Sequence, residues 1–294
     1  MGHIHKELKI LHINIRGIYS SRTEFQQILD EFTPDIATIN ETHLNPSDTL
    51  SIPNYNILRR DRNRRGGGVA ILYIKTLPAI PVQLPAMHSN LEAIQLQVRI
   101  ANWPLNIHTL YNPPGAILPT DYLKYVASQS KSILLSDLNV HHPLLGDAPA
   151  LTNGGGRELV DILGHINLNQ VILPGPTRIP IRQAESCTSP DKILTTMTVY
   201  NRIINVETLP PPNSDHSPVL LTIATPQWSS ITPQQTITKY LYDKADWNKY
   251  SDYIDERMKD YNPDFTTIDE IDKADETLLN VTIQARDLAI PTKK

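Results

Sequence analysis

The chain has 294 residues and a mass of 33.1 kDa, with 40% apolar and 20% charged residues, which is ordinary for a globular protein of one or two domains. This composition excludes the collagen-like, disulfide-rich and fully disordered classes of protein. The single cysteine, Cys187, cannot form an internal disulfide, and no apolar run approaches the roughly 20 residues that span a bilayer. We therefore expect a soluble intracellular protein of the nucleus or cytoplasm that is neither secreted nor bound to a membrane.

Charge is distributed unevenly along the chain. Residues 1–225 hold equal numbers of basic and acidic side chains, so the net charge of −4 resides in residues 226–294. This balance does not indicate a generally basic nucleic-acid binder. One dense basic run contains Arg59, Arg60, Arg62, Arg64 and Arg65. Taken alone, such a run is more often a solvated loop than a binding site.

The first forty residues predict a β-α-β order. Residues 8–15 predict a strand, because apolar side chains alternate between its two faces. Ser21 and Glu24 have the spacing of a capping box, which predicts that a helix begins there. Apolar residues at helical spacing continue this helix until Pro34, which ends it. Residues 35–40 then predict a second strand.

The middle of the chain consists mostly of predicted strands. We expect them at residues 69–74, 91–100, 105–111, 132–139, 170–173, 192–200, 203–209 and 218–223. Helices are expected near residues 121–130 and 157–165. The glycine triplets 66–68 and 154–156 lack the lysine and hydroxyl residue of a phosphate-binding loop, so both are interpreted as turns. Many strands with few helices favour two packed sheets flanked by helices.

The pattern of apolar and polar residues changes near residue 226. Strand patterns stop there, and helices are predicted around residues 247–261 and 268–289. We therefore divide the chain into a domain of residues 1–225 and a helical C-terminal tail of residues 226–294.

Polar residues stand at the ends of several predicted strands. They are Asn14, Glu41, Tyr111, Asp137, Asn139, His141, Asp215 and His216. Side chains at one edge of a sheet form a cleft, where function tends to collect. Carboxylate and amide oxygens are suited to Mg²⁺ or Mn²⁺, and such a set suits metal-assisted hydrolysis of a phosphate ester. Each residue alone also has an ordinary explanation, such as a turn cap or a core aromatic.

The order of these motifs resembles that of the endonuclease/exonuclease/phosphatase superfamily, and most closely the endonuclease domains of LINE-type (non-LTR) retrotransposons of the jockey and R1 kind. The matching segments are 13–17, 41–44, 67–71, 111–114, 137–146, 176–178, Thr188 with Asp191, and 214–219. The resemblance covers about residues 8–225. It implies an α/β fold, a four-layer sandwich of two packed mixed β-sheets flanked by helices.

The resemblance also implies a role for each site residue. Glu41, Asn14 and Asp215 would hold Mg²⁺ or Mn²⁺, and Asp137 would activate the attacking water. Tyr111, Asn139 and His216 would bind the scissile phosphate, with Asp191 fixing the His216 ring. Thr177 matches a position near the DNA-contacting surface, and the run of arginines at 59, 60, 62, 64 and 65 becomes a candidate backbone contact.

Three positions depart from the family pattern. Ser136 replaces a glycine before Asp137, Thr188 replaces a serine, and Pro190 replaces an aliphatic residue before Asp191. None of these changes removes a catalytic group, so activity is expected, although Pro190 could shift Asp191 relative to His216.

The function implied is a metal-dependent DNA endonuclease. It would nick one strand of double-stranded target DNA and leave a 3′-hydroxyl for target-primed reverse transcription. The tail resembles the linker to a reverse transcriptase, so that enzyme and the element RNA are implied partners. No Tyr-x-Asp-Asp motif of the polymerase occurs, and a fragment, a truncated copy and a recruited host gene all remain open. The alternatives are an abasic-site endonuclease or other phosphodiesterase of the superfamily, and a non-catalytic nucleic-acid-binding remnant.

Overall fold

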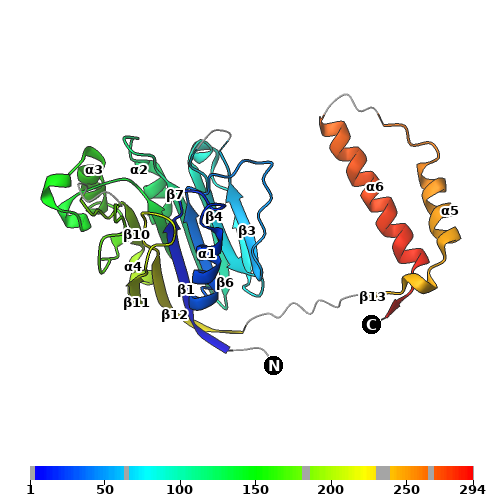
Figure 1. Ribbon diagram of the computed structural model, residues 1–294, viewed down its shortest axis with the longest axis horizontal. Coiled ribbons are helices and arrows are strands. Elements are labelled where there is room, and N and C mark those ends of the chain that lie inside the picture. The colour runs from blue at the N-terminus through cyan, green and yellow to red at the C-terminus, as the bar shows by residue number, and fades with distance from the viewer. Residues whose placement is uncertain (1–3, 63–65, 181–185, 230–238, 264–267, 294) are drawn as a thin grey trace. The chain divides into compact units, whose positions relative to one another are not determined.

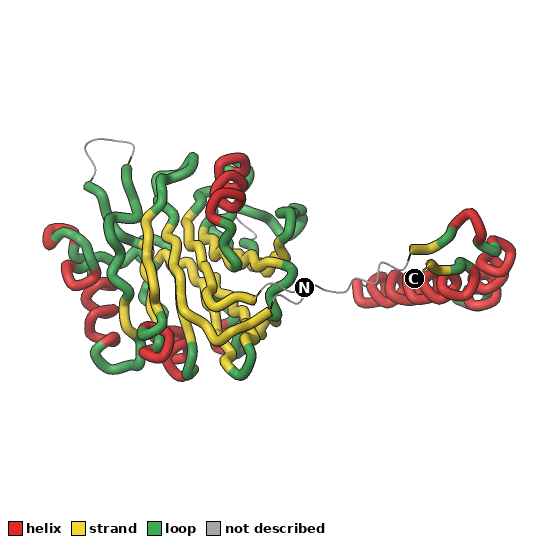
Figure 2. Tube along the Cα trace, turned by 90° about the horizontal axis from the view of Figure 1, so that it is seen from below, coloured by secondary structure: helices red, strands yellow, loops and turns green. Residues whose placement is uncertain are grey.

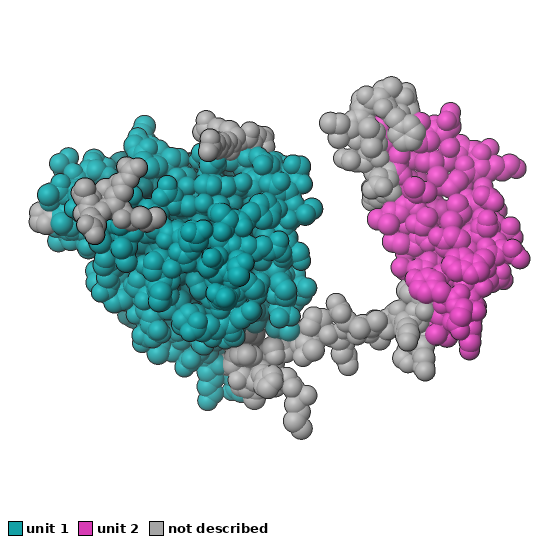
Figure 3. All heavy atoms as spheres, in the orientation of Figure 1, with its two compact units in different colours: residues 1–232 teal, residues 233–294 magenta. Residues whose placement is uncertain are grey.

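Two mixed six-stranded sheets pack face to face in the computed structural model of the chain (Figure 1). The structure describes residues 4–62, 66–180, 186–229, 239–263 and 268–293. The chain divides into two compact units, residues 1–232 and residues 233–294, which are coloured separately in Figure 3. Both large sheets belong to the first unit.

The strands of each sheet are hydrogen-bonded in a non-sequential order. In the first sheet the order is β11 (Ile203–Thr208), β12 (Val219–Ser229), β1 (Ile4–Asn14), β2 (Ile36–Asn40), β4 (Val69–Ile74) and β3 (Tyr55–Arg60). In the second sheet it is β5 (Ala79–Val82), β6 (Glu92–Ile100), β7 (Trp103–Tyr111), β8 (Ser132–Asp137), β10 (Asp191–Thr195) and β9 (Asn169–Gln170). The pairs β1–β2 and β7–β8 are parallel, and the other neighbours are antiparallel.

Helices cover the outer faces of the two sheets and complete four layers. The helices of this unit are α1 (Arg22–Phe32), α2 (Thr120–Ser128), α3 (Gly154–Leu163) and the short α4 (Met197–Tyr200), with 3₁₀ turns at Ala86–His88, Pro143–Leu145 and Pro149–Leu151. Helix α1 buries Phe25 against the first sheet, and α2 and α3 bury Tyr122 and Leu159 against the second. Figure 2 shows helices at both sides of the strands. The predicted four-layer α/β sandwich is confirmed.

Alternation along β1 decides which side chains enter the space between the sheets. Leu11 and Ile13 pack beneath α1, whereas Leu8 and Ile10 pack against the second sheet. Because side chains alternate in a strand, His12 and Asn14 lie on the same inward face as Ile10. This inner face carries both apolar core and, at the end of the strand, polar groups.

Several local predictions were wrong. The strand expected at 192–200 ends at Thr195, after which α4 forms, and the strand expected at 170–173 is the two-residue β9. Strands β3 and β5 were not predicted. The Ser21 hydroxyl does not cap α1, because it donates to the carbonyl of Asn213 at 3.0 Å instead. Gly154–Gly156 form the first turn of α3, and a Cβ on Gly156 would lie 2.0 Å from the His141 carbonyl oxygen. That close approach requires glycine.

The second unit is a helical hairpin. It contains β13 (Lys239–Tyr240), a 3₁₀ turn at Tyr242–Lys244, α5 (Trp247–Met258), α6 (Ile268–Ala289) and β14 (Thr292–Lys293), and β13 pairs antiparallel with β14. Asp246 caps α5 by accepting from the Lys249 amide at 3.0 Å. Tyr253 on α5 donates to Gln284 on α6 at 2.8 Å. Among the described residues, no helix has the length and apolar character needed to cross a bilayer.

Residues 1–232 should fold without the hairpin, because both sheets and all three core clusters of the first unit lie within them. We expect the 1–232 chain to unfold in one cooperative transition, within a few degrees of the same transition in the full chain. Differential scanning calorimetry of both chains measures this. A chain of residues 1–218, which lacks strand β12, should fail to fold and serves as the control.

Candidate active site at the rim of the two sheets

Strand register places three expected site residues in one row. Tyr111 ends β7 and is paired with Asp137, which ends the parallel strand β8. Asp137 is paired in turn with Asp191, the first residue of the antiparallel strand β10. The three residues are aligned across the sheet because β8 lies between β7 and β10 and pairs with both strands. Two buried carboxylates therefore stand side by side at one rim of the second sheet.

Asn14, at the end of β1, connects this row to the first sheet. Its Nδ2 atom donates to Glu41 Oε1 and to Asp137 Oδ2, both at 2.7 Å. Its Oδ1 atom accepts from the backbone amide of Arg16 at 3.1 Å. Because a backbone amide can only donate, this contact fixes which end of the Asn14 amide faces the two carboxylates. Asn14 thus joins Glu41, which follows β2, to Asp137 on the opposite sheet.

A second asparagine, Asn40, also forms hydrogen bonds between the two sheets at this rim. It ends β2 beside Asn14 in the parallel register. Its Oδ1 accepts from the Asp137 amide at 2.7 Å, and its Nδ2 donates to Thr109 Oγ1 on β7 at 3.0 Å. Sequence reasoning did not assign a role to Asn40. The available signal was its place at the end of a predicted strand, directly before Glu41.

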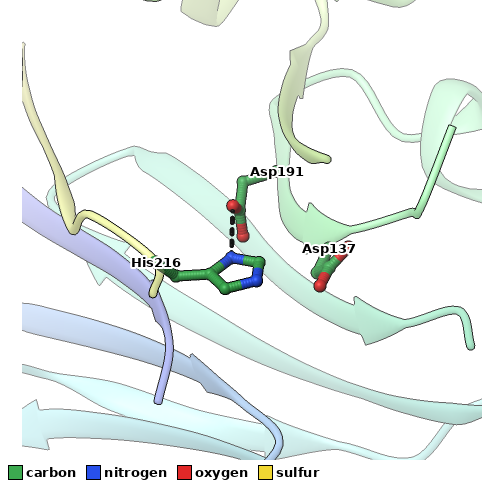
Figure 4. A group of neighbouring side chains, drawn as sticks. All are labelled: Asp137, Asp191 and His216. Carbon is green, nitrogen blue, oxygen red and sulfur yellow. Dashed lines mark hydrogen bonds and ion pairs between the residues drawn. The ribbon is translucent and has the colours of Figure 1, made fainter. Parts of the chain in front are cut away.

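His216 is held against Asp191, as expected. Its Nδ1 lies 2.9 Å from Asp191 Oδ2, and the second ring nitrogen is turned toward Asp137 (Figure 4). The three side chains offer polar atoms that all lie within 4.8 Å of one another. Thr177 is fully buried and donates to Asp191 Oδ2 at 2.6 Å. The surface contact expected for Thr177 does not fit this placement, because its hydroxyl is engaged beneath the surface.

Asp215 is surrounded by cations that sequence reasoning did not assign to the site. Arg16 pairs with its Oδ1 at 2.7 Å, and Arg178 Nε donates to its Oδ2 at 2.9 Å. Both oxygens of the expected metal ligand are therefore occupied by guanidinium groups. Both arginines lie within the motif segments 13–17 and 176–178, and that position was the signal available in the sequence.

A cavity of about 430 Å³ opens onto this group of side chains. Five expected site residues line it, namely Glu41, Tyr111, Asp137, Asn139 and His216. His141, also named at the end of a predicted strand, lines it as well, and so do Arg16 and Arg178, which were not predicted. The cavity thus combines carboxylates, cations and hydrogen-bond donors, which is the mixture needed to bind and hydrolyse a charged ester.

Backbone strain concentrates around the cavity. Arg16, Glu41, His43 and Asn139 have φ values of 48°, 53°, 54° and 50°. These are left-handed conformations that residues other than glycine seldom adopt, and each costs of order 1 kcal/mol or more. Their positions follow the ends of β1, β2 and β8, so the strain arises where strands turn to present polar side chains. Such clustering is typical of a functional site.

Charges at the site are set by burial and by neighbours. Burial, reinforced by the Asp191 carboxylate, raises the pKa of Asp137 to about 7. Burial would likewise raise the pKa of Asp191, but His216 and His12 outweigh it and lower that pKa. Burial would lower the pKa of His216, yet the carboxylates around it, Asp191 foremost, raise the pKa to about 9. At neutral pH the site holds an Asp191–His216 ion pair beside a carboxyl group poised to exchange a proton.

The oxygen donors suited to a divalent cation are Glu41 and Asp137. Burial would raise the pKa of Glu41, but hydrogen bonds from Asn14, His43 and Tyr111 lower it, so this carboxylate is ionised. His216 is protonated below about pH 9, and a protonated imidazole is not a metal ligand. The Asp137–Asp191–His216 cluster therefore suits proton transfer, whereas Glu41 with Asp137 suits a hard cation.

Three of the arginines in the basic run are engaged within the chain. Arg59 pairs with Asp61, Arg60 donates to the Ser89 carbonyl, and Arg62 pairs with Glu92. The Arg62 guanidinium also lies 5.9 Å from the centre of the Tyr111 ring, at the edge of the site. The expected contacts Arg64 and Arg65 lie outside the described residues.

Comparisons with known proteins agree with the motif-based resemblance. Residues 105–220 match the family model described as endonuclease-reverse transcriptase. The endonuclease domain of TRAS1, a telomere-specific non-LTR retrotransposon, is similar with a TM-score of 0.62 and 17% identity, over 74% of this chain and 98% of that chain. AP endonuclease LMAP from Leishmania major is similar with a TM-score of 0.60 and 13% identity, over 75% and 89%. The 3′-5′ exonuclease NExo from Neisseria meningitidis is similar with a TM-score of 0.57 and 18% identity, over 74% and 100%. No curated protein matches the chain.

The raised pKa of His216 predicts a pH-dependent contribution to stability. A group whose pKa is raised on folding, here from 6.5 to about 9, contributes stability that is complete below pH 6.5 and is lost as pH rises through 9. The difference in free energy of unfolding between the wild type and His216→Gln should therefore shrink between pH 6.5 and 9. Urea denaturation of both metal-free chains across this range measures it. A difference that stayed constant would show that the ion pair is absent.

Proposed function

We propose, given that residues 105–220 match the endonuclease-reverse transcriptase family and that the first unit has the fold of the endonuclease/exonuclease/phosphatase superfamily, that this chain is a DNA endonuclease dependent on Mg²⁺ or Mn²⁺. It hydrolyses a phosphodiester in one strand and leaves a 3′-hydroxyl. One observation carries the proposal: Glu41 and His216, which adjoin strands β2 and β12 of the first sheet, and Asp137 from the second sheet line a single cavity.

The residues present fit a hard cation. Glu41 and Asp137 would hold it, since both carboxylates meet at Asn14 and hard cations prefer oxygen ligands. Asn14 and Asp215, expected as further ligands, face the Arg16 amide and two guanidinium groups in this arrangement. The metal, when bound, would screen charge on the phosphate and favour formation of a hydroxide nucleophile.

The remaining side chains supply binding and proton transfer. Asp137 would accept the proton of the attacking water; its pKa is raised to about 7 in the metal-free protein, and a bound cation would lower it. His216 donates a hydrogen bond to a phosphate oxygen, and Asp191 holds its ring. Burial and the Glu41 charge raise the pKa of Tyr111, so its hydroxyl keeps its proton; it donates to Glu41 in this structure and would donate to the phosphate instead when substrate binds. Asn139 lines the same cavity, where its side chain can contact the phosphate.

Cations at the cavity extend the binding surface along the strand. Arg16 and Arg178 line the cavity, and Arg16 is half-exposed. The arginines at 64 and 65 are proposed as further contacts with DNA phosphates, whereas Arg62 is paired with Glu92 in this structure. Each phosphate so neutralised releases counterions, so we expect affinity for double-stranded DNA to fall as salt rises.

The family match suggests where such a nick is used. In an element of this family, the 3′-hydroxyl would prime reverse transcription of the element RNA. Residues 226–294 would then lead toward a reverse transcriptase, which makes that enzyme and its RNA partners of this chain. The fold also resembles an AP endonuclease and a 3′-5′ exonuclease, so an abasic-site or other phosphodiesterase activity is the alternative within the same chemistry. A non-catalytic remnant is disfavoured, since Asn14, Glu41, Asp137, Asp191 and His216 are all present.

Nicking of supercoiled plasmid tests the proposal directly. Wild-type protein with Mg²⁺ or Mn²⁺ should convert supercoiled DNA to the open circle, and EDTA should stop this conversion. Asp137→Asn, which cannot accept the proton, should lower the rate by at least about 10²-fold. Cleavage of a duplex that contains an abasic site, measured in parallel, distinguishes the proposed DNA endonuclease from an abasic-site endonuclease.

The control for this assay is His165→Asn, a change at an exposed histidine on the loop after α3. It should nick at the wild-type rate. Absence of nicking by wild-type protein with either metal, on plasmid and on abasic DNA alike, would contradict the proposal.

Metal binding by Glu41 is tested apart from activity. Glu41→Gln keeps the shape of the side chain and its contact with Asn14 but removes the charge. We expect the affinity for Mn²⁺, measured by electron paramagnetic resonance on DNA-free protein, to fall at least about tenfold, with little change in melting temperature. Unchanged Mn²⁺ affinity would remove Glu41 from the metal site.

A further inference from the structure

A second histidine contacts Asp191 from the first sheet. His12 lies in the middle of β1, facing the space between the sheets, and is 1% exposed. Its Nε2 lies 3.3 Å from Asp191 Oδ1, and its Nδ1 lies 2.9 Å from Thr38 Oγ1 on β2. The structure places it one contact away from the proposed reaction centre.

Hydrogen-bond directions fix the His12 ring. The Thr38 hydroxyl lies 2.9 Å from His12 Nδ1 and 3.2 Å from the Leu11 carbonyl, so Nδ1 either accepts from this hydroxyl or donates to its oxygen. A carboxylate oxygen can only accept, so His12 Nε2 is the donor toward Asp191. The ring is therefore held at both nitrogens and cannot rotate without breaking a buried hydrogen bond, which costs about 1–3 kcal/mol.

Both carboxylate oxygens of Asp191 accept hydrogen bonds, so the carboxylate is fixed in one orientation. His12 holds Oδ1, while Thr177 and His216 share Oδ2 at 2.6 Å and 2.9 Å. His12 on the first sheet thus sets the carboxylate plane of Asp191 on the second sheet, and this carboxylate holds the ring of His216, which precedes β12. A turn of this plane would move the Oδ2 atom away from His216 Nδ1, and the His216 ring would lose the contact that aims its other nitrogen toward Asp137.

We propose that His12 is a positioning residue for His216, acting through Asp191 along the chain Thr38–His12–Asp191–His216. The proposal rests on the function proposed above, in which His216 contacts the scissile phosphate. His12 itself does not line the cavity, so it does not bind DNA. Packing alone would be served by an apolar side chain, because a buried imidazole costs free energy unless both nitrogens are satisfied.

Two amide variants separate positioning from packing. The amide nitrogen of Gln in His12→Gln lies near the place of Nε2 and retains a donor toward Asp191. That of Asn in His12→Asn lies near the place of Nδ1, so this variant retains only the contact with Thr38 and has no donor toward Asp191. We expect His12→Asn to lower the single-turnover nicking rate at least about tenfold, the scale for losing a group one contact from a reacting residue. His12→Gln should stay within about threefold of wild type.

The affinity for DNA should not change in these variants. Affinity for a duplex oligonucleotide, measured in EDTA by fluorescence anisotropy, should be the same for wild type, His12→Gln and His12→Asn. Thr38→Val, which keeps His12 but removes its other anchor, should lower the rate a few-fold and serves if His12→Asn fails to fold. Equal nicking rates for His12→Gln, His12→Asn and Thr38→Val relative to wild type would overturn the proposal.

A spectroscopic readout makes the test independent of nicking. In metal-free protein, the ¹⁵N and ¹H signals of the His216 ring report the hydrogen bond between Nδ1 and Asp191. We expect this signal to be retained in His12→Gln and shifted or lost through solvent exchange in His12→Asn. Identical His216 signals in both variants would overturn the role of His12. Wild-type protein that nicks no DNA would instead refute the proposed function, and the His216 signals would still decide whether His12 positions that ring.

Discussion

The contact of Asn14 with carboxylates from both sheets is the constraint on which the site depends. One amide nitrogen donates at 2.7 Å to Glu41 and to Asp137, which belong to different sheets. Asn40 adds a second link by accepting from the Asp137 amide. These bonds set the spacing of the two sheets at the rim, so the same interactions that close the sandwich also assemble the cavity. Each carboxylate is positioned by the packing of the whole domain.

Burying several charges at this rim is costly, and neighbouring groups offset the cost. Asp191 accepts from His12, His216 and Thr177, and Asp215 is paired with two arginines. Asp137 has only amide donors on its oxygens, and burial beside the Asp191 carboxylate raises its pKa. The uneven distribution of cations thus gives the carboxyl groups different roles. Asp191 and Asp215, which are paired with cations, orient those side chains, whereas Asp137, which has no cation on its oxygens, exchanges a proton. Strained backbone at Glu41 and Asn139 is a further cost at the same place.

Most elements near the site could be predicted from the sequence, because strand ends coincide with changes from apolar to polar residues. Asn14, Tyr111 and Asp137 were placed at strand ends on that basis, and the structure brings them together. Predictions from the local sequence pattern were wrong where contacts with residues distant in the sequence determine what a side chain does. Ser21 has capping-box spacing but donates to Asn213, and Gly156 is glycine because α3 passes close to His141. Thr177 was expected at the DNA surface, yet its hydroxyl is buried against Asp191.

The sequence by itself determined the alternation of strands and helices, the polar residues at strand ends and the chemistry of their groups, since these follow from local periodicity and side-chain type. Only the tertiary structure decided which group each residue faces. Arg16 and Arg178 meet Asp215, and His12 meets Asp191, across separations of 199, 37 and 179 residues. Such contacts depend on strand register and on how the sheets stack, and a one-residue shift of register would turn every side chain of a strand to the other face.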